Sequence, residues 1–285
     1  MSFMVTSAHA SLYGSRLIRL LRGLTDESPD PALNNFALHF GKLADLSGSM
    51  SLLNAHDAID HVTTDDSACD LAAAREDFMK VRTALIRAVV MSFVPPRGLT
   101  PVRMVKLPTA EKLHSHYQAT GVYGAPRPWL PKVYAAAFDP YAAFYVARQR
   151  DLAMKVRRLR EHQRKLVRQA SDEHAQLAAL DEALDDALNT RTQELFSVIP
   201  KLLARRFGKL AFAETDALPK RSTARDLEPW LEPDGWITRF CGDMRELLLA
   251  ELEIRLRPVI GLMESLPGGD SEGQASIDGK ELLRD

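Results

Sequence analysis

The sequence lacks the features that mark secreted and membrane-spanning proteins. Its two cysteines, Cys69 and Cys241, stand far apart and form no CxxC or zinc-ligand pattern, so each is expected to be a small core residue in a reducing compartment. No apolar run approaches the roughly 18 residues that a membrane span needs, and the N-terminus has no signal-peptide pattern. These absences predict a cytoplasmic protein without a transmembrane segment.

The sequence also lacks a net charge and the common catalytic motifs. Its 37 Lys and Arg nearly balance 38 Asp and Glu, and the formal charge of −1 argues against a generally basic nucleic-acid coat protein. None of the patterns GxGxxG, GxxxxGK[ST], GxSxG and HExxH occurs. We therefore expect no catalytic residues and no cofactor, and we predict that the protein is not an enzyme.

Histidines give no metal site. His56 and His61 are five residues apart, and His114 and His116 form an HxH pattern. A zinc site needs three or four convergent ligands, and neither pair has a cysteine or carboxylate at the usual spacing. We expect no bound metal.

Pairs of adjacent acids could suggest acid–base chemistry, but their spacing argues against it. The pairs are Asp65 with Asp66 and Asp185 with Asp186. Neighbouring residues on a helix point in different directions. Both pairs are expected to belong to solvated helix surfaces.

Apolar residues recur at helical spacing through most of the chain and predict an all-α fold. The expected architecture is a helical bundle with a long antiparallel coiled-coil-like hairpin and a kinked C-terminal helix. That last helix should cover about 235–266, begin at an Asp234 cap, kink at Pro258 and be largely buried. Its apolar positions are too many for a surface helix.

Composition divides the chain into four predicted units. Residues 1–93 should form an N-terminal bundle of three helices, at about 11–24, before Gly48 and from Asp65 or Asp66 to Phe93. Eight of the sixteen prolines fall within 94–140, which is expected to be an irregular arm or linker. Residues 141–266 hold the hairpin and the C-terminal helix, and 267–285 should be a flexible tail. Four aromatic residues of the arm are expected to pack against other parts: Tyr117, Tyr123, Trp129 and Tyr134.

The segment 141–207 combines a heptad seam with a reversal of charge. The expected seam positions are Tyr145, Leu152, Leu159 and Leu166, alternating with Gln149, Val156, Gln163 and Ala170. Residues 141–170 carry nine basic against two acidic residues, whereas 171–195 carry seven acids against one arginine. The charges should therefore lie on opposite halves of one element.

The geometry of this segment depends on the residues at its middle. Ser171 followed by Asp172 and Glu173 has the chemistry of a helix N-cap. A break there produces an antiparallel hairpin, and an unbroken helix would be a rod of about 100 Å. We favour the hairpin, with Pro200 at a kink or in the first turn of a further helix.

The heptad assignment places a row of basic residues away from the seam, and this row is the candidate binding surface. The assignment puts Arg150, Arg157, Arg158, Arg164, Lys165 and Arg168 on that side, and Arg148 and Lys155 complete the candidate binding surface. A solvated surface or pairing with the acidic half is one interpretation. An acidic protein partner and a nucleic-acid backbone are the others. A shorter row, Arg16, Arg19 and Arg22, leaves a solvated face and a docking or phosphate-binding face open in the same way.

Five segments together resemble a β-proteobacterial family of helical proteins whose function is unknown. They are SRLIRLL (15–21), FDPYAAFYVARQRDL (138–152), LAALDEALDDAL (177–188), IPKLLARRF (199–207) and MRELLLAELEIRLRPVIGLMESL (244–266). The resemblance covers nearly the whole chain apart from the proline-rich arm.

Members of that family are encoded beside a MotA/TolQ/ExbB-type proton channel and an OmpA/MotB-type peptidoglycan binder, an arrangement similar to a type III Zorya anti-phage system. The resemblance implies a cytosolic accessory or effector component that is recruited to an inner-membrane motor. Its implied partners are a sister cytosolic protein, the cytoplasmic tail of the MotA-type motor or a second copy of itself. A DNA-binding effector that uses the basic row is the alternative.

Overall fold

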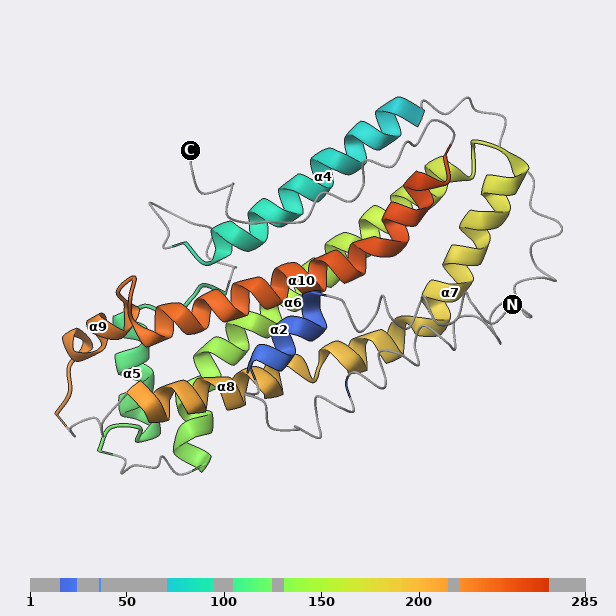
Figure 1. The fold of residues 1–285 in the computed structure, drawn as a ribbon. Coiled ribbons are helices and arrows are strands. Elements are labelled where there is room, and N and C mark those ends of the chain that lie inside the picture. The colour runs from blue at the N-terminus through green and yellow to red at the C-terminus, as the bar shows by residue number, and fades with distance from the viewer. Residues whose placement is uncertain are drawn as a thin grey trace.

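The computed structural model describes residues 16–24, 36, 71–94, 105–124, 131–214 and 221–266, and within these ranges every regular element is a helix (Figure 1). The predicted all-α fold is confirmed. Among the described residues, no helix combines the length and apolarity that a membrane crossing needs. The elements are α2 (Arg16–Leu24), α4 (Leu71–Ser92), α5 (Ala110–Thr120), α6 (Pro131–Val167), α7 (Asp172–Phe196), α8 (Ile199–Glu214), the 3-10 helix η1 (Ala224–Leu227), α9 (Glu228–Leu231) and α10 (Trp236–Glu264).

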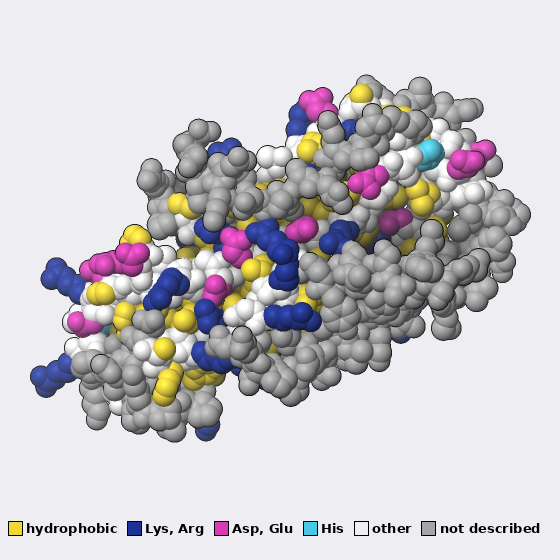
Figure 2. Space-filling view, in the orientation of Figure 1, with side chains coloured by type: hydrophobic (Ala, Val, Ile, Leu, Met, Phe, Trp, Pro, Cys, Tyr) yellow, Lys and Arg dark blue, Asp and Glu magenta, His cyan; other side chains and the backbone are white. Residues whose placement is uncertain are grey.

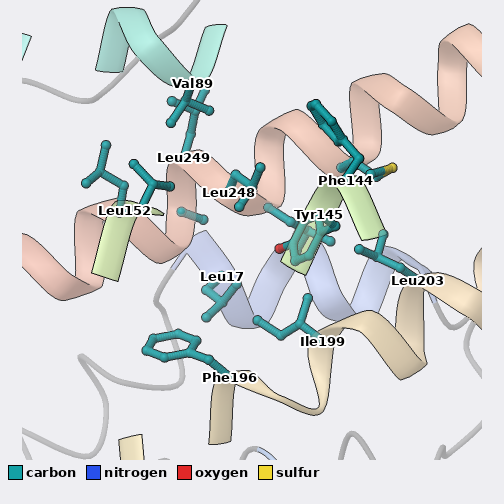
Figure 3. Packing of buried hydrophobic residues seen from close by; sticks show 14 of the residues in the cluster. Leu17, Val89, Phe144, Tyr145, Leu152, Phe196, Ile199, Leu203, Leu248 and Leu249 are labelled. Atoms are coloured by element: carbon teal, nitrogen blue, oxygen red, sulfur yellow. The ribbon is translucent and has the colours of Figure 1, made fainter. Parts of the chain in front are cut away.

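Two long helices, α6 and α10, lie side by side and form the centre of the molecule (Figure 1). Helix α4 packs on both of them, α2 and α8 pack on α10, and α5 packs on α6. The buried apolar side chains form one cluster to which all these helices contribute. Figure 3 shows part of it, with Leu17, Val89, Tyr145, Phe196, Ile199 and Leu248 drawn from six different helices.

Helix α10 is buried on nearly all sides, as its many apolar positions predict. Six consecutive residues, 247–252, are buried. Gly235, not Asp234, is the N-cap residue, and its cap has no side-chain hydrogen bond. The predicted Asp234 cap is therefore wrong by one position, whereas Pro258 lies inside the helix as expected.

The α6–α7 junction confirms the predicted break. Helix α6 ends at Val167, and the Ser171 hydroxyl accepts a hydrogen bond from the backbone N–H of His174 at 3.3 Å. Asp172 and Glu173 occupy the first turn of α7, where carboxylates suit the positive end of the helix dipole. Helix α7 then turns back along α6 to complete the hairpin (Figure 1), and Pro200 falls in the first turn of α8 as predicted.

The region expected to be an irregular arm contains more helix than its prolines suggest. Residues 110–120 form α5, which starts at a Thr109 cap and ends at Gly121 with φ of 72°, a left-handed conformation that favours glycine. Residues 131–140 belong to α6, where Pro131 stands at the first position and so costs no hydrogen bond. The expected irregular structure is therefore wrong for these two stretches.

Three of the arm's aromatic residues pack on the core as expected. Tyr117 is fully buried, and Tyr123 and Tyr134 are partly buried against the same cluster. Trp129 lies outside the described residues. Two short helices, η1 and α9, precede α10.

The N-terminal helices share the central core. Leu17 and Leu21 of α2, and Phe78 and Leu85 of α4, are buried in the cluster that contains α10. Most of the helix expected before Gly48 and the tail 267–285 lie outside the described residues, as do Cys69, His56 and His61. Cys241 is a free, buried core thiol as predicted. The division into four units stays a prediction.

A close approach between α8 and α6 predicts how two glycine variants will behave. The Gly208 N–H donates to the Tyr134 hydroxyl at 3.0 Å, and a Cβ on Gly208 would lie 2.0 Å from a carbon of that ring. We expect G208A to lower the free energy of unfolding by about 1–3 kcal/mol, because the ring must move. Urea unfolding measures the difference.

Gly242 of α10 provides the matched control, since nothing lies within 4 Å of the Cβ it would gain. We expect G242A to raise the free energy of unfolding by about 0.5–1 kcal/mol, because alanine loses less conformational freedom in a helix. Equal effects of G208A and G242A would contradict the contact between α8 and Tyr134.

Candidate functional site

The basic row predicted from the heptads is divided between the surface and the interior of the hairpin. Arg150, Arg157, Arg158 and Lys165 are exposed on α6 as predicted. Arg157 pairs with Glu161 at 3.0 Å. Lys155 is half-buried, and its ammonium group lies 2.8 Å from an Asp151 carboxylate oxygen.

Arg148 does not face solvent, although it is one of the candidate binding residues. Its side chain is 9% exposed and donates to the backbone oxygen of Val105 at 3.1 Å. The guanidinium carbon also lies 5.8 Å from the centre of the Phe144 ring. The residue therefore joins the segment before α5 to α6.

Arg164 is also buried, which corrects its predicted outward position. Its Nε lies 2.6 Å from Asp181 and its terminal nitrogen 2.8 Å from Asp185. Arg160 reaches the same two carboxylates at 2.5 and 2.6 Å. Two arginines of α6 and two aspartates of α7 thus form a network with no net charge, and the expected solvated role of Asp185 is wrong.

The physical reason for the Arg164 correction is the drift of a straight helix against a heptad repeat. A 3.6-residue helix rotates by roughly 20° per heptad relative to a 3.5 repeat. The buried positions accordingly run Leu152, Val156, Leu159, Gln163 and Val167, so that Val167 replaces Leu166 as the last buried position. The same rotation turns Arg164 towards α7.

The network raises the pKa of its buried arginine, Arg164. Burial alone would lower the pKa of Arg164, but the hydrogen bonds that it donates to Asp181 and Asp185 and the charges of these two carboxylates outweigh burial and raise the pKa. Arg168 pairs with Glu182 one turn further along the hairpin. Pairing with the acidic half, one of the interpretations left open by the sequence, therefore applies to Arg160, Arg164 and Arg168.

Sequence reasoning missed Arg160 as a member of this network, although its spacing carries the signal. Arg160 and Arg164 are four residues apart on one helix, and Asp181 and Asp185 are four apart on the next. Residues at that spacing share a helix face. Two such pairs across a turn can therefore meet once the helices run antiparallel.

A second polar cluster lies at the centre of the core and was not predicted. Glu251 of α10 is 1% exposed, and the Tyr145 hydroxyl donates to one of its carboxylate oxygens. The Gln149 amide donates to the two carboxylate oxygens at 3.1 and 2.9 Å and to the Phe196 backbone oxygen at 3.1 Å. Arg255 completes the cluster at 3.7 Å from the carboxylate.

Burial shifts the pKa values of the ionisable groups in this cluster. Burial raises the pKa of the Glu251 carboxyl, although Arg255 and the hydrogen bonds oppose the rise. Burial also lowers the pKa of Arg255, whose guanidinium carbon lies 4.1 Å from the centre of the Phe196 ring. Burial and the neighbouring Glu251 raise the pKa of Tyr145, which therefore keeps its proton and donates it.

The two histidines of the HxH pattern have structural partners. His114 Nδ1 lies 2.7 Å from the Tyr123 hydroxyl, and His116 donates from Nε2 to the Ala136 backbone oxygen at 2.6 Å. Within the part of the chain that the structure describes, no group of three His, Cys, Asp or Glu side chains could hold a metal ion.

The sequence from residue 4 to residue 267 matches the family described as "Protein of unknown function (DUF3348)", and the chain belongs to that family. Neither the comparison with curated proteins nor the comparison with solved structures finds a match.

Replacing one buried and one exposed arginine of the same helix tests the division of the basic row. We expect R164A to lower the free energy of unfolding by about 1.5–3 kcal/mol, because the partly buried carboxylates of Asp181 and Asp185 lose the charged hydrogen bonds from Arg164 and keep only those from Arg160. R158A should change it by less than about 0.5 kcal/mol. Chemical unfolding of both variants gives the comparison, and a similar cost for the two would contradict the burial of Arg164.

The raised pKa of Glu251 predicts a dependence of stability on pH. The folded state binds the Glu251 proton more tightly than the unfolded chain, whose carboxyl titrates near 4.5. The contribution of this carboxyl to stability is therefore complete below that pH and is lost as the pH rises through the raised value. The glutamine of E251Q cannot titrate, so the stability of this variant should not fall for this reason as the pH rises.

Unfolding free energies of the parent protein and E251Q across about pH 4 to 8 test this sign. The stability of E251Q relative to the parent protein should increase as the pH rises above the unfolded value. A difference in unfolding free energy that stays constant across the range would contradict a raised pKa of Glu251. A difference that increasingly favours the parent protein as the pH rises would indicate a lowered pKa.

Proposed function

We propose that this member of the family is a non-enzymatic docking protein that uses the outer face of α6 to bind an acidic protein surface. The observation that carries the proposal is the exposed row Arg150, Arg158 and Lys165 on a helix whose opposite side is held by the core. A rigid helix presents such a row with little loss of conformational freedom on binding.

The sequence resemblance supplies the proposed partners. We infer that the protein works in the cytoplasm as an accessory or effector component of an anti-phage system similar to type III Zorya, beside a proton-driven membrane motor. A sister cytosolic protein and the cytoplasmic tail of the MotA-type subunit are the proposed binding partners, and a second copy of the chain is a further one. Recruitment to the inner membrane would then follow from docking.

DNA binding by the same row is the alternative. Five of the eight predicted residues are buried or ion-paired: Arg148, Lys155, Arg157, Arg164 and Arg168. Each phosphate contact needs an available positive charge. The row is therefore better suited to a few directed contacts with a protein than to a nucleic-acid backbone.

Charge reversal of three exposed residues tests the proposal in cells that carry the neighbouring genes. R150E/R158E/K165E should lose at least about 10-fold in co-purification with the sister protein or the MotA-type subunit, since like charges now face an acidic partner. Protection against phage plaque formation should fall with it. The control R150K/R158K/K165R keeps every charge and should retain both activities.

The outcomes separate the two hypotheses. Unchanged co-purification and unchanged protection in the reversed variant would refute docking through α6. Loss of DNA retention at low salt with intact co-purification would favour the alternative. An absence of protection by the unmodified genes across a broad phage panel would count against the defence role itself.

A further inference from the structure

The outer face of α6 carries an exposed methionine among its basic residues. Met154 is 47% exposed, whereas Leu152 and Val156, which lie on the opposite side of the helix, are 3% and 5% exposed. A single apolar side chain on a protein surface is common and needs no explanation by itself. What distinguishes Met154 is the charge on either side of it.

Arg150 and Arg158 lie one turn before and one turn after Met154. Positions four apart on a helix are rotated by about 40° and separated by about 6 Å along the axis, so the three side chains form one ridge about 12 Å long. Both arginines are exposed, and within the described part of the chain neither side chain has an ion pair or a hydrogen bond. These three residues are called the α6 ridge below.

The acids of this part of α6 do not cancel the charge of the ridge. Asp151 and Glu161 are each held by a neighbouring basic residue, at 2.8 and 3.0 Å. No other acid occurs between positions 148 and 168. The charges of the ridge therefore remain for a partner, and the exposed Lys165 adds a third charge two turns after Arg158.

The face of the molecule that carries α2, α8 and α10 is different. Lys and Arg side chains there lie beside Asp and Glu side chains (Figure 2). Arg16 and Arg206, for example, are ion-paired with Glu246 and Asp243 at 2.5 and 3.0 Å. Much of the positive charge on that face is thus engaged within the molecule, and the α6 ridge is better placed to meet a charged partner.

The sign of the ridge argues against a symmetric dimer formed through it. A two-fold interface places the same patch of both copies face to face. Arginines would then oppose arginines, and like charges that face each other across an interface are unfavourable. The complement that fits the ridge is an acidic surface on a different chain.

We propose that the α6 ridge binds an amphipathic acidic helix of another protein, with Met154 as the apolar anchor between two arginine–carboxylate pairs. This inference rests on the docking function proposed above and specifies its anchor residue and the form of the partner. A helix with an apolar side chain and carboxylates four residues before and after it has the same spacing as the ridge, so all three contacts can form together.

Met154 also distinguishes a protein partner from a phosphate-bearing one. The methionine side chain is flexible and fits irregular apolar surfaces, and interfaces between proteins combine an apolar centre with a polar rim. Phosphates would engage the two arginines and leave Met154 without a contact. A ridge that is apolar in the middle and basic at both ends matches the protein interface.

Binding of a fluorescein-labelled helical peptide to the full chain, measured by anisotropy, tests the proposal. The peptide carries Glu, Leu and Glu four residues apart on one face of a helix rich in Ala and Gln. We expect M154Q to weaken binding by at least about 5-fold, because the anchor loses its apolar contact. R150Q/R158Q should weaken binding at low salt by at least about 10-fold, because both charged hydrogen bonds are lost.

M79Q of α4 is the matched control, since Met79 is 49% exposed and carries the same substitution away from the ridge. It should bind the peptide as the parent protein does. M154L keeps an apolar anchor of similar volume and should bind within about 3-fold of the parent protein. Circular dichroism should show all variants equally helical.

Co-purification from cells that carry the neighbouring genes separates this inference from the docking on which it rests. M154Q should reduce co-purification with the sister protein or the MotA-type subunit, as R150E/R158E/K165E does. Normal co-purification of M154Q with a loss in R150E/R158E/K165E would overturn the anchor role of Met154 and leave docking in place. Normal co-purification of both variants would overturn both proposals.

Four results with isolated components would also overturn the inference. Three concern the peptide: no binding at low salt, an equal loss in M154Q and M79Q, and equal binding of a peptide in which Gln replaces the Leu. The fourth is binding of duplex DNA that R150Q/R158Q abolishes and M154Q leaves unchanged, in the absence of a peptide effect of M154Q. That result would assign the ridge to phosphates.

Discussion

The burial of the Glu251 carboxyl constrains how the two central helices can pack. A carboxyl group inside an apolar core costs several kcal/mol unless its oxygens are hydrogen-bonded. Tyr145 and Gln149 of α6 meet this requirement, and Gln149 also contacts the last turn of α7. A shift of α6 along α10 would break these bonds together, so the cluster determines the register of the core that α2, α4, α5, α7, α8 and α9 pack against.

The charge reversal in the middle of the chain has its main effect inside the molecule. Arg160 and Arg164 neutralise Asp181 and Asp185 across the hairpin. Fewer basic residues of α6 are therefore available to a partner. Segregated charge in a sequence therefore indicates an interaction without saying whether the partner is another segment or another molecule.

The sequence allowed prediction of the features that depend on local chemistry. Ser171 indicates the helix break because an N-cap depends only on neighbouring residues. The wide apolar face of α10 likewise indicates that this helix is buried. Helix α5 was not predicted, because the high proline content of 94–140 outweighed the signal of its cap residues Thr109 and Gly121. The role of Glu251 depends on contacts between segments that are distant in sequence, which periodicity does not encode.

The packing of α10 also has a consequence for the order in which the chain can fold. This helix begins at Trp236, is the main packing partner of α2 and α6, and also packs on α4. During synthesis the earlier helices therefore leave the ribosome with apolar faces that have no permanent cover, and contacts between residues more than 200 positions apart form last. Such intermediates expose hydrophobic surface. Chaperone binding to nascent chains that stop before residue 236 should accordingly exceed binding to chains that extend beyond it.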